Sequence, residues 1–155
     1  GKYFDGELPA AGPISDAETT IHALLTKTVV DADACINELD FSGAINQVKT
    51  FIEHINGYVT EQEPWVLAKS EETQGALATV LYTVCESLRA IAILYNPVMP
   101  KAMTELWSNI GAFESLGKLD DQPVHTANTW GQLPVGVRVT KGASLFPRLE
   151  DPENV

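Results

Sequence analysis

The stretch that decides the fold is Thr73–Tyr95, which reads TQGALATVLYTVCESLRAIAILY. Its apolar residues recur at intervals of three and four, the period of one face of an α-helix. They are Leu77, Val80, Leu81, Val84, Leu88, Ile91 and Tyr95, with Cys85, Ala92 and Ile93 on flanking positions. So broad an apolar surface predicts a central helix that other elements cover on several sides.

Two amphipathic helices are predicted before this central helix. The first begins at Ser15, which has the capping-box spacing to Glu18, and it ends at the break around Asp40. The second runs from Phe41 to the residue before Pro64, because proline has no N–H to continue the helix. The apolar stripes are Ile21, Leu24, Leu25, Ala32, Cys35, Ile36 and Leu39, then Phe41, Ala44, Ile45, Val48, Phe51, Ile52, Ile55, Tyr58 and Val59.

The chain after the central helix is predicted to be shorter and less regular. Pro100 suits the first position of a short fourth helix, which Gly111 closes. Residues 133–140 and 143–146 show brief apolar alternation, typical of short strands or extended chain. The predicted fold class is all-α: a helical bundle over residues 1–117, with an irregular C-terminal segment, residues 118–155, packed on it in the same domain.

Composition describes one globular domain and sets a limit on its partners. The chain has 155 residues, of which 45% are hydrophobic and 20% charged, enough for a single core. Its 21 acidic and 10 basic residues leave a net charge of −11, which opposes a partner held through phosphates. No membrane span or signal peptide is indicated, so a cytoplasmic location is expected. Because the first residue is not Met, we expect a piece of a longer polypeptide.

Catalysis and metal binding are not indicated within this sequence. His22, His54 and His125 are scattered, and Cys35 and Cys85 form no Cys-x-x-Cys pair, so neither zinc nor a catalytic cysteine is expected. Both cysteines lie on apolar stripes and are predicted to be buried, reduced thiols. There is no phosphate-binding loop, dinucleotide fingerprint or nucleophile elbow. We therefore expect no catalytic residue, no metal and no cofactor here.

Trp65 is the residue that periodicity does not explain. It follows Pro64 at a helix–loop junction, where either the ring covers the end of the bundle or its face receives a stacked base. Glu53, Asn56 and Thr60 are spaced by three and four, so they share one face of the second helix. That face is either simply solvated, or its carboxylate repels ligands that approach by a wrong path.

Four phrases, in order, carry a resemblance to a known family. The phrases are Lys2-Tyr3-Phe4-Asp5-Gly6; Asn56-Gly57-Tyr58 with Pro64-Trp65-Val66-Leu67-Ala68-Lys69; Tyr95-Asn96-Pro97-Val98-Met99-Pro100; and Leu145-Phe146-Pro147-Arg148-Leu149-Glu150. Together they resemble the anticodon-binding domain of methionyl-tRNA synthetases over nearly the whole chain. The resemblance implies a helix-bundle anticodon-binding domain of a class I aminoacyl-tRNA synthetase, an enzyme that uses ATP to attach methionine to its tRNA.

The resemblance also implies a partner and a site. The anticodon loop of methionine tRNA would stack a base on Trp65, Pro64 would fix the ring, and Asn56, Glu53 and Thr60 would lie on the same surface. An unpaired loop is the kind of RNA that aromatic platforms read, which explains how an acidic domain binds it.

Several features of the family are absent from this sequence. An Asn and an Arg four residues apart, which read the wobble cytosine in the family, precede the Lys2–Gly6 phrase there, whereas this sequence starts after them. The His-Ile-Gly-His and Lys-Met-Ser-Lys-Ser motifs and the cysteine-rich insertion are also missing. Sites for ATP, methionine and any zinc are therefore expected in a catalytic domain of the same polypeptide, and this fragment alone is expected to be inactive.

Two alternatives stay open at this point. A sibling synthetase for isoleucine, valine, leucine or cysteine has a similar bundle, although the Pro64-Trp65 phrase favours methionine. An acidic helical module for protein–protein interaction is the other alternative, and the net charge suits it better than it suits RNA.

Overall fold

The computed structural model describes residues 3–147, and helices dominate that part of the chain. The helices are α1 Asp16–Asn37, α2 Phe41–Gln62, α3 Pro64–Leu67, α4 Gln74–Tyr95, α5 Pro100–Asn109 and α6 Ala112–Leu116, with 3-10 turns η1 Phe4–Gly6, η2 Glu71–Thr73, η3 Leu119–Asp121 and η4 Val124–Asn128. Over the described residues there is no strand, only an isolated antiparallel bridge between Glu7 and Arg138. The all-α prediction is confirmed, and residues 133–140 and 143–146 consist of turns, bends and extended backbone rather than strands.

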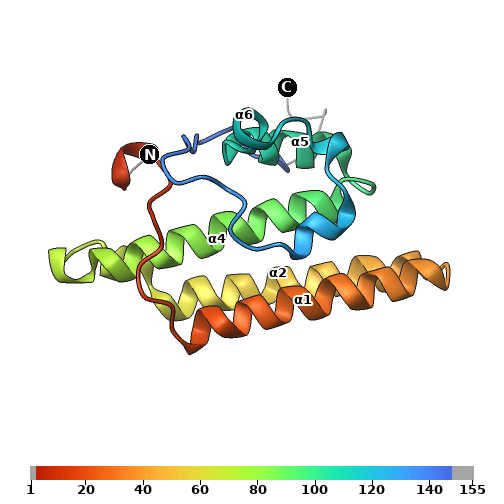
Figure 1. Cartoon of the computed structure of the whole chain (residues 1–155), viewed down its shortest axis with the longest axis horizontal. Coiled ribbons are helices and arrows are strands. Elements are labelled where there is room, and N and C mark those ends of the chain that lie inside the picture. The colour runs from red at the N-terminus through yellow and green to blue at the C-terminus, as the bar shows by residue number, and fades with distance from the viewer. Residues whose placement is uncertain (1–2, 148–155) are drawn as a thin grey trace, which may run out of the picture.

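The helices are arranged in layers around α4. Figure 1 shows α1 and α2 as a long hairpin on one side of α4, with α5 and α6 on the other side, while the C-terminal segment crosses α4 and its η4 turn also contacts α1. α4 contacts α1, α2, α3, α5, η2 and η4. Leu77, Ala90 and Ala92, on different faces of α4, are all completely buried. The prediction of a central helix covered on several sides is therefore confirmed.

Local chemistry sets the ends of these helices as predicted. The Ser15 hydroxyl accepts from the Ala17 N–H at 3.2 Å, and the Glu18 carboxylate accepts from the Ser15 N–H at 2.7 Å. This capping box begins α1. Gly111 follows α5 with φ 75°, and a Cβ there would lie 2.6 Å from the Arg138 carbonyl oxygen. Only glycine fits that turn without displacing the C-terminal segment.

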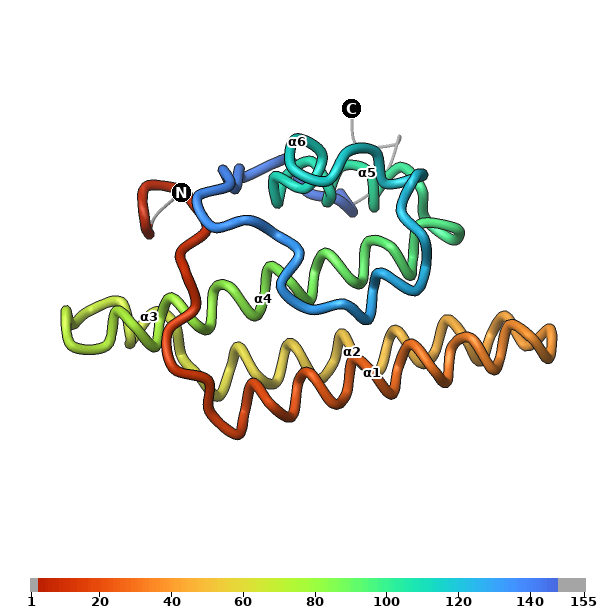
Figure 2. The backbone as a smooth tube through the Cα atoms, viewed as in Figure 1, coloured from red at the N-terminus to blue at the C-terminus, as the bar shows by residue number. Residues whose placement is uncertain are grey.

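The C-terminal segment is tied to α4 by a buried ion pair. Arg89 donates from Nε to Glu86 at 3.0 Å, and its other nitrogens donate to the carbonyls of Thr126 at 3.1 Å and Thr129 at 2.7 Å. Glu86 also accepts from the backbone N–H groups of Gly131 at 3.0 Å and Leu133 at 2.6 Å. Both charged side chains are buried. Figure 2 shows the segment running across α4.

Several predicted core positions are wrong in detail. Ile36 and Leu39 belong to the apolar stripe of α1, yet they are 47% and 76% exposed. The α1–α2 turn extends beyond the end of α4 (Figure 1), and these side chains are left largely uncovered. Cys35 is half-buried rather than buried. Cys85 is also only half-buried, although desolvation raises the pKa of its thiol to about 12 and keeps it protonated at neutral pH.

The run Glu71–Tyr95 is long and apolar enough to cross a membrane by length and composition. Within the fold, 67% of its most apolar stretch is buried, and central helices of globular domains pass the same test.

Candidate nucleic-acid interface

A backbone kink at Glu63 sets the position of Trp65. α2 ends at Gln62, which confirms the predicted stop before Pro64, and Glu63 adopts a left-handed conformation with φ 45° and ψ 59°. Pro64 then occupies the first position of α3, where its missing N–H costs no helical hydrogen bond. Trp65 is therefore the second residue of a short helix, not part of a helix–loop junction as predicted.

The turn that carries Trp65 is fastened to the bundle. Leu67 packs against the hydrophobic core, and its carbonyl accepts a hydrogen bond of 2.5 Å from the Thr73 hydroxyl. The Ala68 N–H donates to the Pro64 carbonyl at 3.0 Å. The indole is consequently presented on a turn that is held at both ends.

Trp65 differs from the other two tryptophans in what surrounds its ring. Trp107 is completely buried, and its indole N–H donates to the Gly117 carbonyl at 2.8 Å. Trp130 is partly covered, with its ring centroid 4.0 Å from that of His22. Trp65 is 49% exposed, and no residue in 3–147 accepts a hydrogen bond from its indole. Since a ring that only covered the bundle would be largely hidden, this exposure favours the stacking interpretation.

The three α2 residues predicted for the site lie on one exposed face. The Thr60 hydroxyl donates to the Asn56 carbonyl at 2.9 Å, so its proton is not available to donate a hydrogen bond to a ligand. The Asn56 side-chain amide makes no hydrogen bond to any described residue. Glu53 pairs with Lys49 at 3.7 Å, and both side chains are about two-thirds exposed. At 1.5 Å per residue, Asn56 lies about 9 Å and Glu53 about 14 Å from Gln62 along the helix axis. Thr60 and Asn56 therefore lie nearer the Trp65 end of α2 than Glu53 does.

A buried hydrogen-bond chain supports this end of α2 from behind. The Tyr58 hydroxyl donates to Glu18 at 2.5 Å, and Glu18 in turn accepts from Ser15. Burial acts to raise the pKa of Glu18, but the hydrogen bonds from Ser15 and Tyr58 lower it overall. Burial and the contact with Glu18 raise the pKa of Tyr58. The chain joins the start of α1 to the last turns of α2, and it keeps Tyr58 out of the exposed surface.

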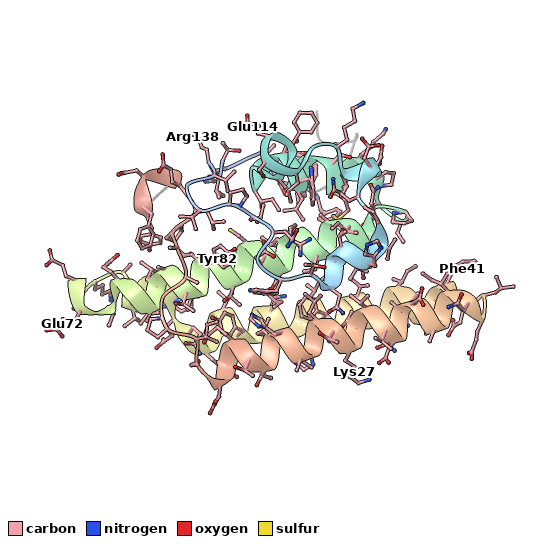
Figure 3. All side chains as sticks on the ribbon, in the orientation of Figure 1. Lys27, Phe41, Glu72, Tyr82, Glu114 and Arg138 are labelled. Carbon is pink, nitrogen blue, oxygen red and sulfur yellow. The ribbon has the colours of Figure 1, made fainter. Side chains whose placement is uncertain are left out.

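Charges near Trp65 are mostly negative, with one cation that the sequence-based site did not include. Glu61, Glu63 and Glu72 are exposed, and Figure 3 shows Glu72 at the end of the molecule remote from Phe41. Lys69 is exposed and forms no ion pair with any residue of 3–147. Its signal in the sequence is its place as the last residue of the Pro64–Lys69 phrase, one helical turn after Trp65.

Metal binding finds no support in the geometry. Within residues 3–147, no three His, Cys, Asp or Glu side chains come together as a metal site would require.

The comparisons with known proteins agree on one family. The sequence model described as the anticodon binding domain of methionyl tRNA ligase matches residues 8–155. The methionine–tRNA ligase of Streptomyces coelicolor is 56% identical over 154 residues, which are 97% of this chain and 29% of that protein. The methionine–tRNA ligase of Deinococcus radiodurans is 39% identical over 149 residues, 96% of this chain and 21% of that protein. This chain thus spans less than a third of these relatives.

Solved structures give the same result for the fold. The crystal structure of free Mycobacterium tuberculosis methionyl-tRNA synthetase superposes with a TM-score of 0.84 at 27% identity, over 97% of this chain and 30% of that one. The same enzyme bound by methionyl-adenylate superposes with a TM-score of 0.79 at 26% identity, over 94% and 28% of the two chains. The helical bundle described above is therefore an arrangement already seen in that enzyme.

Proposed function

Since this chain belongs to the family of methionyl-tRNA ligase anticodon-binding domains, we propose that it holds the anticodon loop of methionine tRNA at the α3 end, with Trp65 as the stacking platform. The observation that carries this proposal is the half-exposed indole on a fastened turn, in a chain whose other two tryptophans are used in packing. A base–aromatic stack suits an unpaired loop, whose bases can be splayed onto a protein surface. The family match also decides between the sibling synthetases in favour of methionine.

The residues around Trp65 contribute the other contacts to the anticodon loop. Pro64 and the left-handed Glu63 fix the direction of the ring. The Asn56 side-chain amide forms no hydrogen bond with any described residue, and it has both donor and acceptor atoms for a base edge or a ribose. Thr60 keeps only its oxygen lone pairs available. Lys69 supplies a cation for a phosphate of the loop.

The negative charge of the domain shapes how it binds. With Lys69 as the unpaired cation beside Trp65, few counterions are released on binding, so the affinity of this surface depends weakly on salt. Glu53, set back along α2, repels phosphates that approach by another path. Stacking and edge contacts carry the recognition, and the carboxylates oppose indiscriminate RNA binding.

The longer polypeptide would perform the chemistry. The M. tuberculosis relative is described as bound by methionyl-adenylate, which forms from methionine and ATP with release of pyrophosphate. By that likeness, ATP, methionine and any zinc bind in the catalytic part of the same polypeptide, in the cytoplasm. This chain contributes recognition of the tRNA and is inactive by itself.

The test is Trp65→Ala in the full enzyme, with Phe113→Ala as the matched control. Phe113 is an equally exposed aromatic residue, but it lies on α6. Loss of one base stack costs about 1 to 3 kcal/mol, which is about a 5-fold to 150-fold loss of kcat/KM for methionine tRNA. Trp65→Phe is expected to keep part of the activity, and Phe113→Ala all of it.

Two results would overturn the assignment. Aminoacylation by Trp65→Ala at the wild-type kcat/KM would show that no base stacks there. An unfolded Trp65→Ala domain, seen by circular dichroism, would return the ring to a structural role. Measuring tRNAs with altered anticodons separates recognition of the anticodon from general RNA affinity.

A further inference from the structure

An apolar hollow lies at the end of the molecule opposite Trp65, where the α1–α2 turn extends beyond α4. Its volume is about 310 Å³, and α1, α2, the end of α4 and η4 all contribute to its lining. Figure 3 shows Phe41 at this end of the molecule. The partly exposed apolar residues around it are Ile36, Phe41, Ile45, Val98 and Val124, with exposed fractions between 37% and 60%. We call this surface the hairpin-end groove.

The floor of the hairpin-end groove is built into the core. Ala44, Val48 and Ile93 line it and are buried. The Tyr95 hydroxyl donates to the Ile45 carbonyl at 3.0 Å and so joins the end of α4 to α2 beneath the groove. The groove is thus formed before any partner arrives, and a contiguous apolar surface of this kind is typical of an interaction site.

The charged residues around the groove are mostly acidic. The segments that line it lie within residues 29–48, 93–98 and 120–125, and these contain no Lys or Arg. They contain the carboxylates of Asp33, Glu38, Asp40, Asp120 and Asp121, and that of Asp31, which pairs with Lys27. Asp33 lines the hollow itself. The Asn96 amide donates to Asp120 at 2.9 Å, which holds that carboxylate next to Pro97 and Val98.

We propose that the hairpin-end groove binds a basic amphipathic helix of a partner protein. Apolar side chains at helical spacing enter the hollow, while Lys and Arg on the flanks of that helix face the carboxylates. Anionic lipids and nucleic acids carry the wrong charge for this rim. A second copy of this chain would bring two acidic rims together across a two-fold axis, which opposes self-association.

The test uses a fluorescein-labelled peptide of about 14 residues, roughly four helical turns, with Leu on one face and Lys on the other. Two comparison peptides are a scramble of the same composition and a version with Glu in place of Lys. Fluorescence anisotropy measures their binding to this chain and to the full enzyme. We expect the helical Leu–Lys peptide to bind at least about ten-fold more tightly than either comparison peptide.

Matched variants locate the binding. Phe41→Ala is expected to weaken the helical peptide at least about ten-fold, as removal of an interface anchor does, whereas Phe113→Ala has no effect. Asp33→Asn is expected to weaken binding at low salt, and Glu105→Gln, which changes an exposed carboxylate on α5 outside the lining of the groove, is not. Aminoacylation by the full-enzyme Phe41→Ala variant is expected to be unchanged, which separates this surface from the Trp65 site.

Each other outcome would overturn the proposal in a definite way. Equal binding of the scrambled peptide would leave only nonspecific charge attraction. Binding by this chain but not by the full enzyme would show that another part of the same polypeptide covers the groove. A dimer in sedimentation that Phe41→Ala dissolves would assign the groove to a second copy.

Discussion

Replacing Arg89 by methionine is expected to destabilise the fold strongly. Arg89 and Glu86 are only 1% and 0% exposed as side chains, and their closest atoms are 3.0 Å apart. In Arg89→Met, the Glu86 carboxylate keeps the N–H groups of Gly131 and Leu133 but loses its only cation among the described residues. The Thr129 carbonyl loses its donor as well, and the Thr126 carbonyl keeps only the Thr129 N–H at 3.1 Å. Removing one partner of a buried pair costs about 3 to 5 kcal/mol of unfolding free energy.

Urea unfolding and thermal unfolding, followed by circular dichroism at neutral pH, measure this cost. For a domain of this size, each kcal/mol lowers Tm by about 2 to 4 °C, so we expect a fall of roughly 6 to 20 °C. Arg138→Met is the matched control, because the Arg138–Glu7 pair is 3.6 Å long and both side chains are more than half exposed. Its loss is expected to cost less than about 1 kcal/mol.

A double variant extends the test, and one result would contradict the prediction. Combining Arg89→Met with Glu86→Gln removes the stranded charge, so part of the lost stability is expected to return. If Arg89→Met unfolded within about 1 kcal/mol of the wild type, the ion pair would not be what holds the C-terminal segment to α4.

Three further predictions concern pH, specificity and the isolated chain. The pKa of Glu18 is lowered in the folded state from an ordinary value of 4.5, so its contribution to stability is complete above pH 4.5 and is lost as the pH falls through the folded pKa. The difference in unfolding free energy between wild type and Glu18→Gln, measured in urea, is therefore expected to shrink on acidification. A difference that does not change with pH would contradict this. In filter binding, Glu53→Gln is expected to raise the affinity of the full enzyme for non-methionine tRNAs more than its affinity for methionine tRNA. This difference is expected to shrink as salt screens the charge. An equal rise for all tRNAs would show that Glu53 repels RNA without regard to its identity. This chain alone, at a net charge of −11, is expected to fold but to bind tRNA weakly, and tight anticodon-dependent binding by it would show that the recognition surface is misplaced.

The amino-acid sequence by itself determined where the long helices begin and end. The capping box of Ser15 and Glu18, the stop before Pro64 and the turn at Gly111 all act within a few residues along the chain. Such signals are local, so a linear pattern contains them in full. The same holds for the shared face of Glu53, Asn56 and Thr60, which helical spacing alone predicts. The restart of the helix at Pro64 was missed because four residues are too few to show a period.

Only the tertiary structure decided which of these surfaces are covered. Glu86 and Arg89 read as an ordinary charged pair on a helix, yet they are buried because residues 126–133 fold over them from about 40 positions away in sequence. Ile36 and Leu39 are predicted core residues, yet they are exposed because they lie at the α1–α2 turn, which extends beyond the end of α4. The exposure of Trp65 is likewise a property of the tertiary structure, because its place after Pro64 is compatible with either a covered or an open ring. A periodic pattern specifies which side of a helix is apolar, whereas burial depends on whether a distant segment arrives to cover that side.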